Sequence, residues 1–181
     1  MNDVDILKKI EKKVLWLACW MIHNANHIRE NQDGLKVGGH QASSASIVSI
    51  MTALYFSILR PEDRVAVKPH ASPVFHAIQY LSGLQTKEKI QNFRGFGGAQ
   101  SYPSRTKDID DVDISTGSVG LGVAMTSFIS LIQDYVARKK FYKNKPLGRM
   151  IALVGDAELD EGNVYECLQE GWKHDLRLSL I

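Results

Sequence analysis

The spacing of apolar residues changes along the chain, and each kind of spacing predicts a different element. Apolar residues three and four positions apart predict helices over the ranges 4–29, 45–59, 74–92, 121–136 and 164–172. The third of these is divided in two at Ser82-Gly83. Short runs of branched apolar residues predict buried strands at 65–67, 150–154 and 176–181. Helices that alternate with strands predict an α/β fold, in which a parallel sheet is flanked by helices.

The last thirty residues have the clearest strand–helix–strand pattern. The strand at 150–154 ends at Gly155-Asp156, a helical pattern follows, and the apolar run 176–181 comes next. Ligands bind outside the carboxyl ends of parallel strands, which is where Asp156 stands. A carboxylate beside a helix start can hold a divalent cation, and the helix amides favour phosphate. We therefore predict a site for a cation and a phosphorylated ligand around Asp156.

Two histidines stand at comparable places before this region. His40 follows Gly38-Gly39, whose lack of side chains allows close backbone approach to a ligand, and His70 follows the predicted strand 65–67. Ser43 and Ser44 come just after His40, where a helix is expected to start. They could cap that helix, or their hydroxyl groups could bind phosphate oxygens, and the sequence favours neither interpretation.

Glycine is also concentrated in two later segments. Residues 95–113 show no periodicity, which in a compact domain indicates a functional or cofactor-covering loop. Residues 115–122, STGSVGLG, then open a long helix with three glycines. Their GxxGxG spacing matches neither the dinucleotide-binding fingerprint nor the P-loop.

Composition narrows the class of protein. The 181 residues are 44% apolar with a net charge of +2, which indicates one domain and argues against a nucleic-acid partner. Cys19 and Cys167 fall in helical patterns and predict buried thiols rather than a disulfide. We find no signal peptide and no apolar run near ~18 residues, so we expect a cytoplasmic protein without a membrane span. His23 and His27, four residues apart, have no third ligand nearby and are not expected to bind metal.

Taken in order, these segments resemble the diphosphate-binding domain of the thiamine diphosphate enzymes, in the branch of transketolase and homodimeric pyruvate dehydrogenase. The resemblance extends from about Val37 to Leu180. It depends on the order and spacing of the segments Val37-Gly38-Gly39-His40, Lys68-Pro69-His70-Ala71-Ser72-Pro73, Thr116 to Gly122, and Gly155-Asp156-Ala157-Glu158. Within the family, Asn92-Phe93-Arg94, Ser101-Tyr102-Pro103 and Asp160-Glu161 look most like the decarboxylating component of pyruvate dehydrogenase.

The resemblance implies a role for each matching residue. Asp156 would bind Mg²⁺, which would hold the diphosphate of thiamine diphosphate, and Ala157 and Glu158 would line the same turn. Ser43 and His70 would lie against the diphosphate. His40 would face the thiazolium ring and the substrate carbonyl, and with His70 it is a candidate catalytic residue. Backbone groups of Ser118, Val119 and Gly120 would meet the aminopyrimidine. The reaction would be decarboxylation of a 2-keto acid followed by acyl transfer. We expect Asp156, His40 and His70 to share one cleft.

Two positions depart from the pattern of the family. Ala157 stands where a second glycine is usual, and alanine tolerates a positive φ poorly. Lys68 stands where the family tends to have glutamine.

The resemblance also implies partners. Residues 1–181 would form a diphosphate-binding domain that is incomplete at its C-terminal end, with an N-terminal helix over residues 1–30. The pyrimidine-binding domain, with the glutamate that activates the cofactor, would be missing or on another chain, so we expect a homo- or hetero-oligomer and no turnover by this chain alone.

Other interpretations remain open. The substrate could be a ketose phosphate, with transketolase-type ketol transfer. The chain could instead be a non-catalytic remnant or half of a split enzyme. A less favoured alternative is an unrelated nucleotide-binding α/β domain.

Overall fold

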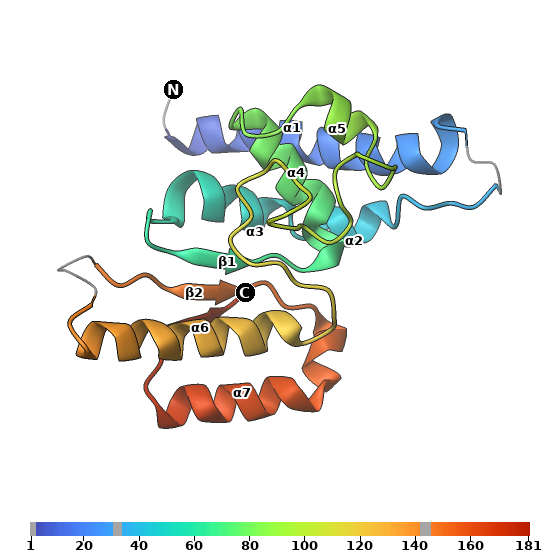
Figure 1. Ribbon diagram of the computed structural model, residues 1–181. Helices are drawn as coiled ribbons and strands as arrows, with labels where there is room; N and C mark the ends of the chain where they lie inside the picture. The colour runs from blue at the N-terminus through green and yellow to red at the C-terminus, as the bar shows by residue number, and fades with distance from the viewer. Residues whose placement is uncertain (1–2, 31–33, 142–145) are drawn as a thin grey trace. The chain divides into compact units, whose positions relative to one another are not determined.

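The computed structural model describes residues 3–30, 34–141 and 146–181 (Figure 1). The loop predicted at Asn31–Gly34 lies outside the described residues except for Gly34. The chain forms two compact units: unit 1 comprises residues 1–59 and 69–112, and unit 2 comprises residues 60–68 and 113–181.

Unit 1 is helical. Its long first helix packs against α2, α3 and α4. The elements in chain order are α1 (Asp3–His23), the π-helix η1 (Asn24–Ile28), α2 (Gln41–Ala45), α3 (Val48–Ala53), the π-helix η2 (Leu54–Ile58), the 3₁₀ turn η3 (Pro69–Ala71), α4 (Ser72–Leu81) and α5 (Lys87–Gln91).

The core of unit 1 lies between α1 and α4. One face of α1 is buried at positions three and four apart, from Val14 to Ile22, as the periodicity predicts. Helix α4 starts with Pro73 in its first turn, where proline costs no hydrogen bond. The chain then turns at Gly83 with φ +77°, so α4 and α5 are separate helices, as predicted.

The prediction of one continuous helix over residues 45–59 is wrong in two ways: the helix begins earlier, and it is interrupted. The helix begins at Gln41, with His40 at the N-cap position, and it is interrupted between α2 and α3. At the interruption, the hydroxyl of Ser46 donates to the carbonyl of Ser43 (3.0 Å), and the Ile47 amide bonds only three residues back, to Ser44. These bonds replace one turn of regular α-helix.

Unit 2 is an α/β unit, and its described residues contain a three-stranded parallel sheet in the order β1-β2-β3. The strands are β1 (Arg64–Ala66), β2 (Met150–Ala152) and β3 (Leu178–Leu180). Val65 is in register with Ile151, and Ile151 with Ser179. The predicted fold class, a parallel sheet flanked by helices, is confirmed.

Two helices pack together in unit 2. Helix α6 (Leu121–Arg138) lies along the strands, and α7 (Gly162–Lys173) packs against α6 (Figure 1). A small core of Val123, Ala152, Val164 and Cys167 joins them to the sheet. Trp172, the last residue of the helical pattern predicted at 164–172, is 83% exposed and is not part of this core.

One segment of unit 1 meets the length and hydropathy criteria for a membrane span. Gln41–Ile58 has a mean hydropathy of 1.2 over 18 residues, contrary to our expectation that no stretch approaches this length. A single such helix is weak evidence for insertion, since core helices pass the same test. Of this segment 28% is buried, with Val48, Met51 and Leu54 among the buried residues.

The buried carboxylate of Asp63 holds the start of the sheet together. It is 4% exposed and accepts from the backbone amides of Arg149 (2.7 Å) and Arg60 (3.0 Å). It also pairs with the Arg149 guanidinium, at 2.5 Å from Nη2. Burial by itself would raise the pKa of Asp63, but the hydrogen bonds and the charge of Arg149 outweigh it and lower the pKa to about 2. Because Asp63 precedes β1 and Arg149 precedes β2, this pair fixes how the two strands begin.

We predict that Asp63→Asn destabilises the protein at neutral pH by about 2 kcal/mol, since a shift of one pKa unit corresponds to about 1.4 kcal/mol. The pKa in the folded state is lowered, so the stabilisation is complete above the unfolded pKa near 4 and is lost as the pH falls through about 2. Urea unfolding of both proteins between pH 7 and pH 2 should therefore converge at the acid end. Asp160→Asn, at an exposed position in the same unit, is the control and should change little.

Candidate functional site

The cofactor-binding residues predicted in unit 2 lie at one edge of the sheet. Lys68 follows β1 and Asp156 follows β2, both at carboxyl ends of parallel strands. The segment before α6 joins them there, because Ile114 forms a parallel bridge with Ala66 and the hydroxyl of Thr116 donates to the carbonyl of Val67 (3.1 Å). This edge is where open α/β sheets bind ligands.

The carboxylate of Glu158 connects the two glycine turns of this edge. It accepts from the amide of Gly155 at 2.7 Å and from the amide of Gly120 at 3.4 Å. Because each of its oxygens accepts from one backbone amide, Glu158 holds the two turns together, and its place as a residue that lines the cofactor site stays a prediction. The turn at Gly120 and the turn that follows Gly155 are therefore joined through one side chain.

Asp156 and Ala157 lie between Gly155 and Glu158 in the sequence, and the conformation of Ala157 differs from the expectation of a positive φ. Asp156 is exposed, and no hydrogen bond to its carboxylate occurs within the described part of the chain. Ala157 lies in the 3₁₀ turn η4 (Asp156–Asp160) and is not among the described non-glycine residues with positive φ. The turn does not require a left-handed residue at position 157, so alanine introduces no backbone strain there.

Two further side chains at this edge were not assigned from the sequence. The ammonium of Lys68 lies against Gly155, where an added Cβ would collide with it. The side-chain oxygen of Asn163 lies against Gly120, is buried, and accepts no hydrogen bond from any described residue. Gly120 also has φ +74°, so both the backbone and the space around it require glycine.

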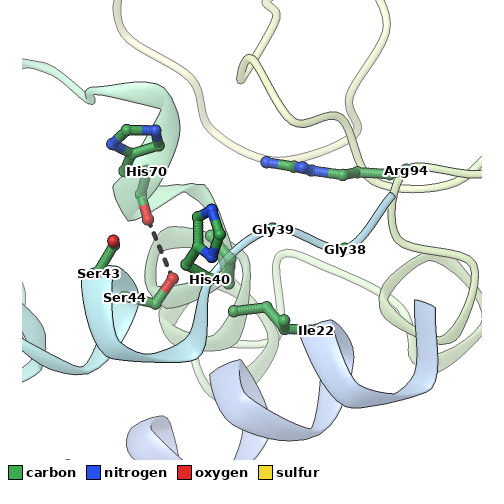
Figure 2. A pocket seen from close by; sticks show the side chains of 9 residues that line it. Ile22, Gly38, Gly39, His40, Ser43, Ser44, His70 and Arg94 are labelled. Carbon is green, nitrogen blue, oxygen red and sulfur yellow. Dashed lines mark hydrogen bonds between the residues drawn. The ribbon is translucent and has the colours of Figure 1, made fainter. Parts of the chain in front are cut away.

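In unit 1, His40 and His70 line one pocket of about 220 Å³ (Figure 2). Its lining comes from α1, the segment before α2, α2 itself, η3, the start of α4 and the loop after α5: Ile22, Gly38, Gly39, His40, Ser43, Ser44, His70, Pro73 and Arg94. The two imidazole rings are exposed and take no hydrogen bond from any described residue. They are free to donate or accept a proton from a bound molecule.

The side-chain amide of Asn26 fixes the glycine segment of this pocket. Its oxygen accepts from the Gly38 amide at 2.6 Å, and its nitrogen donates to the Gly39 carbonyl at 3.1 Å. A Cβ at Gly38 would lie 2.5 Å from the carbonyl of Ile22, so no other residue fits. Gly39 has φ +87°. This clamp sets the direction from which His40 enters the pocket.

The two serines after His40 have different roles. Ser44 is buried, and its hydroxyl donates to the carbonyl of His70 (3.0 Å), which holds that turn against α2. Ser43 is exposed at the pocket, with no hydrogen bond to its hydroxyl among the residues described. Because His40 occupies the N-cap position, the capping interpretation of the serines is excluded, and only Ser43 remains available to a ligand.

The irregular segment 95–113 is anchored by a buried histidine. His76 on α4 is fully buried, with Nδ1 2.5 Å from the Asp110 carboxylate and Nε2 2.7 Å from the carbonyl of Gln100. Asp108 accepts from the amides of Gln100 and Ser104. Although His76, Asp108 and Asp110 lie close enough to share a metal ion, these internal bonds already occupy their ligand atoms. We interpret the cluster as structural.

The cysteines, the His23–His27 pair and the expected shared cleft are the remaining predictions from the sequence. Cys19 and Cys167 are free thiols; Cys167 is buried as predicted, but Cys19 is only half-buried. Burial, followed by the charge of Glu166, raises the pKa of Cys167. His23 and His27 are exposed with their rings 5.1 Å apart. His40 and His70 belong to unit 1 and Asp156 to unit 2, and the expected cleft common to all three stays a prediction.

The fold and these residues together define the class of protein. Over 96% of this chain the structure matches transketolase from Leishmania mexicana with a TM-score of 0.80 at 18% identity, covering 26% of that protein. The pyruvate dehydrogenase E1 component of Mycolicibacterium smegmatis is 27% identical over 171 residues, and transketolase-like protein 2 of Mus musculus is 30% identical over 141 residues. With the family model that matches residues 5–181, these similarities show that the chain is an N-terminal domain of the thiamine diphosphate-dependent enzymes.

The family can be stated more narrowly. Residues 5–181 match the family model described as 1-deoxy-D-xylulose-5-phosphate synthase, and the chain belongs to that family. The chain spans 18% of the length of the Mycolicibacterium relative and 21% of the Mus musculus relative.

We predict that Asn26→Asp destabilises unit 1 by about 1–3 kcal/mol. The carboxylate retains an acceptor for Gly38 but loses the donor to Gly39, which places two oxygens against each other. Chemical denaturation measures the loss of stability, and faster hydrogen exchange of the Gly38 amide should accompany it. The matched control is Asn24→Asp, which loses one exposed bond to the carbonyl of Gln91 and should cost less. Equal effects of the two variants would contradict the clamp.

Proposed function

We propose that this chain binds thiamine diphosphate through Mg²⁺ at Asp156 and serves in a pyruvate dehydrogenase-like reaction, the decarboxylation of a 2-keto acid followed by acyl transfer. Membership of a family of thiamine diphosphate-dependent enzymes supports the cofactor. The proposal depends on one observation at the carboxyl edge of the sheet. Glu158 bonds to the amides of Gly120 and Gly155, whereas the neighbouring carboxylate of Asp156 is exposed and has no hydrogen bond to the described residues.

The residues of this edge fit a metal-bound diphosphate. Mg²⁺ is usually held by one or two carboxylates, with phosphate oxygens and water completing its shell. Asp156 offers one such carboxylate, exposed and without a hydrogen bond to the described residues. The ammonium of Lys68 lies beside the same turn and adds a positive charge that favours an anion.

The residues of unit 1 suit the substrate side of the reaction. Thiamine diphosphate, when bound, supplies the nucleophilic carbon that allows cleavage of a bond next to a carbonyl. His40 and His70 present exposed imidazoles to one pocket, where they can donate a proton to the substrate oxygen as it gains charge. Ser43 contributes a hydroxyl at the same pocket, and we propose that it and His70 bind the diphosphate.

We propose the following context for this function. A pyrimidine-binding domain completes the site, on this polypeptide or on another chain, and the assembly is an oligomer in the cytoplasm. The similarity to pyruvate dehydrogenase E1 components over 88% of this chain favours a 2-keto acid over a ketose phosphate.

We predict that Asp156→Ala removes Mg²⁺-dependent binding of thiamine diphosphate. Titration calorimetry of the chain with thiamine diphosphate, with and without Mg²⁺, should show saturable binding only with the metal, and the variant should lose at least ~10-fold in affinity because the metal loses its protein ligand. Asp160→Ala, an exposed acidic residue in the same turn, is the matched control and should bind as the unaltered chain does. Binding that is independent of both Mg²⁺ and Asp156 would refute the metal assignment.

A second experiment identifies the substrate. The chain is combined with a pyrimidine-binding domain of a pyruvate dehydrogenase E1 component and supplied with either pyruvate or xylulose 5-phosphate. We expect release of carbon dioxide from pyruvate and no ketol transfer from the sugar. The reverse result would assign the chain to transketolase-type chemistry.

A further inference from the structure

We propose that Arg94 is a specificity-determining residue of the unit 1 pocket, where its guanidinium receives an oxyanion that presents two oxygens in one plane. The residue lines the pocket with His40 and His70. Figure 2 shows its guanidinium over Gly39, directed toward both imidazole rings. The inference deepens the proposed function, on which it rests for the origin of the oxyanion: the carboxylate of a 2-keto acid or the diphosphate of the cofactor.

The hydrogen bonds of Arg94 leave one edge of its guanidinium unused. Nη1 donates to the carbonyl of Val37 at 2.8 Å. Nε is buried and has no hydrogen-bond partner, and no described residue accepts from Nη2. Nε–H and one Nη2–H point in the same direction and form the fork that binds carboxylate or phosphate through two parallel bonds. A buried donor without a partner is costly, so a ligand that supplies the acceptor is favoured.

The position of the guanidinium is fixed from several sides. Arg94 has φ +60°, an uncommon backbone conformation for a non-glycine residue, and its amide donates to the carbonyl of Ala99 at 2.9 Å. The Asn26 clamp sets the segment that carries Val37 and Gly39. A Cβ at Gly39 would lie 3.2 Å from Nη1 and 3.3 Å from Nη2 of Arg94, so a side chain there would crowd the guanidinium that rests on this segment. A pre-organised cation of this kind loses little entropy on binding.

The charge of Arg94 suits an anion in this pocket. Burial lowers the pKa of the guanidinium, and the phenol of Tyr102 offsets part of that effect, but an arginine stays protonated at pH 7. No carboxylate is hydrogen-bonded or ion-paired to Arg94 within the described part of the chain. The pocket therefore holds an uncompensated positive charge beside two imidazole rings, which favours an anionic ligand with a polar group at its other end.

The test follows the Nε–H signal of Arg94 by NMR in the 181-residue chain labelled with ¹⁵N-arginine. Three probes are titrated: pyruvate, inorganic pyrophosphate, and acetone, which retains a carbonyl but has no carboxylate. We expect a saturable shift of the Arg94 signal, and slower exchange of its proton, with pyruvate if the substrate supplies the oxyanion or with pyrophosphate if the cofactor does. Acetone should have no effect. Absence of a saturable shift with both anions would overturn the proposal, and this result requires no variant.

Two variants distinguish the contribution of the two parallel N–H donors of Arg94 from the contribution of its positive charge. Arg94→Lys retains the positive charge but lacks the parallel donors, and we expect it to bind the effective anion at least about tenfold more weakly. Arg138→Lys, at an exposed position at the end of α6, is the matched control and should bind the anion unchanged. Equal affinity of Arg94→Lys and the unaltered chain, with unchanged circular dichroism, would refute the role of the fork.

Calorimetry with thiamine diphosphate and Mg²⁺ on the unaltered chain separates this inference from the proposed function. A chain that binds no thiamine diphosphate but whose Arg94 responds to pyruvate disproves the cofactor proposal and leaves the anion site standing. A chain that binds thiamine diphosphate while Arg94 responds to neither anion disproves the anion site alone.

Discussion

The clamp of Asn26 on the segment Gly38-Gly39 is the interaction on which the pocket of unit 1 depends. Glycines allow a backbone to approach closely, but they have no side chain with which to hold their own conformation. The amide of Asn26 supplies both a donor and an acceptor to this segment, in the manner of a neighbouring strand. His40 follows directly, and the guanidinium of Arg94 rests on the same backbone. The pocket has its shape because one side chain of the π-helix η1 satisfies two backbone groups at once.

In unit 2 a side chain also holds two glycine backbone groups, but it is the carboxylate of Glu158 rather than an amide. The carboxylate of Glu158 accepts from the amides of Gly155 and Gly120, so one side chain holds two glycine turns that are far apart in the sequence. Glu158 is therefore a structural part of the turn, and Asp156 is left as the carboxylate available to a cation. Of these two neighbouring acidic residues, Glu158 is half-buried and hydrogen-bonded to backbone amides, and Asp156 is exposed without such a bond among the described residues. The alanine at position 157 fits the turn because the turn has no left-handed residue there.

Charge is placed differently in the two units. In unit 2, Asp63 and Arg149 compensate each other at the start of the strands, and the pair is structural. In unit 1, the carboxylate of Asp110 in the irregular segment 95–113 is hydrogen-bonded to the imidazole of His76 on α4. Arg94 differs from these because its guanidinium is partly buried without a carboxylate beside it. A protein tolerates such an arrangement when a ligand provides the missing charge. The contrast between the compensated Asp63–Arg149 pair and Arg94 supports a function for Arg94 rather than a structural role alone.

The sequence by itself determined the elements whose causes are local. Apolar spacing predicted α1, α4, α6 and α7, and branched apolar runs predicted the three strands and their parallel arrangement. The order of the glycine and histidine segments was enough to indicate the family. The roles that this resemblance implies for His40, His70 and Asp156 stay predictions. Tertiary structure alone decided which polar groups remain free. Ser43 is available while Ser44 is buried, Glu158 is occupied while Asp156 is not, and Arg94 lies in the pocket. Each of these outcomes depends on hydrogen bonds between residues distant in the sequence, such as Ser44 to His70 and Asn26 to Gly38, and spacing along the chain contains no information about such bonds.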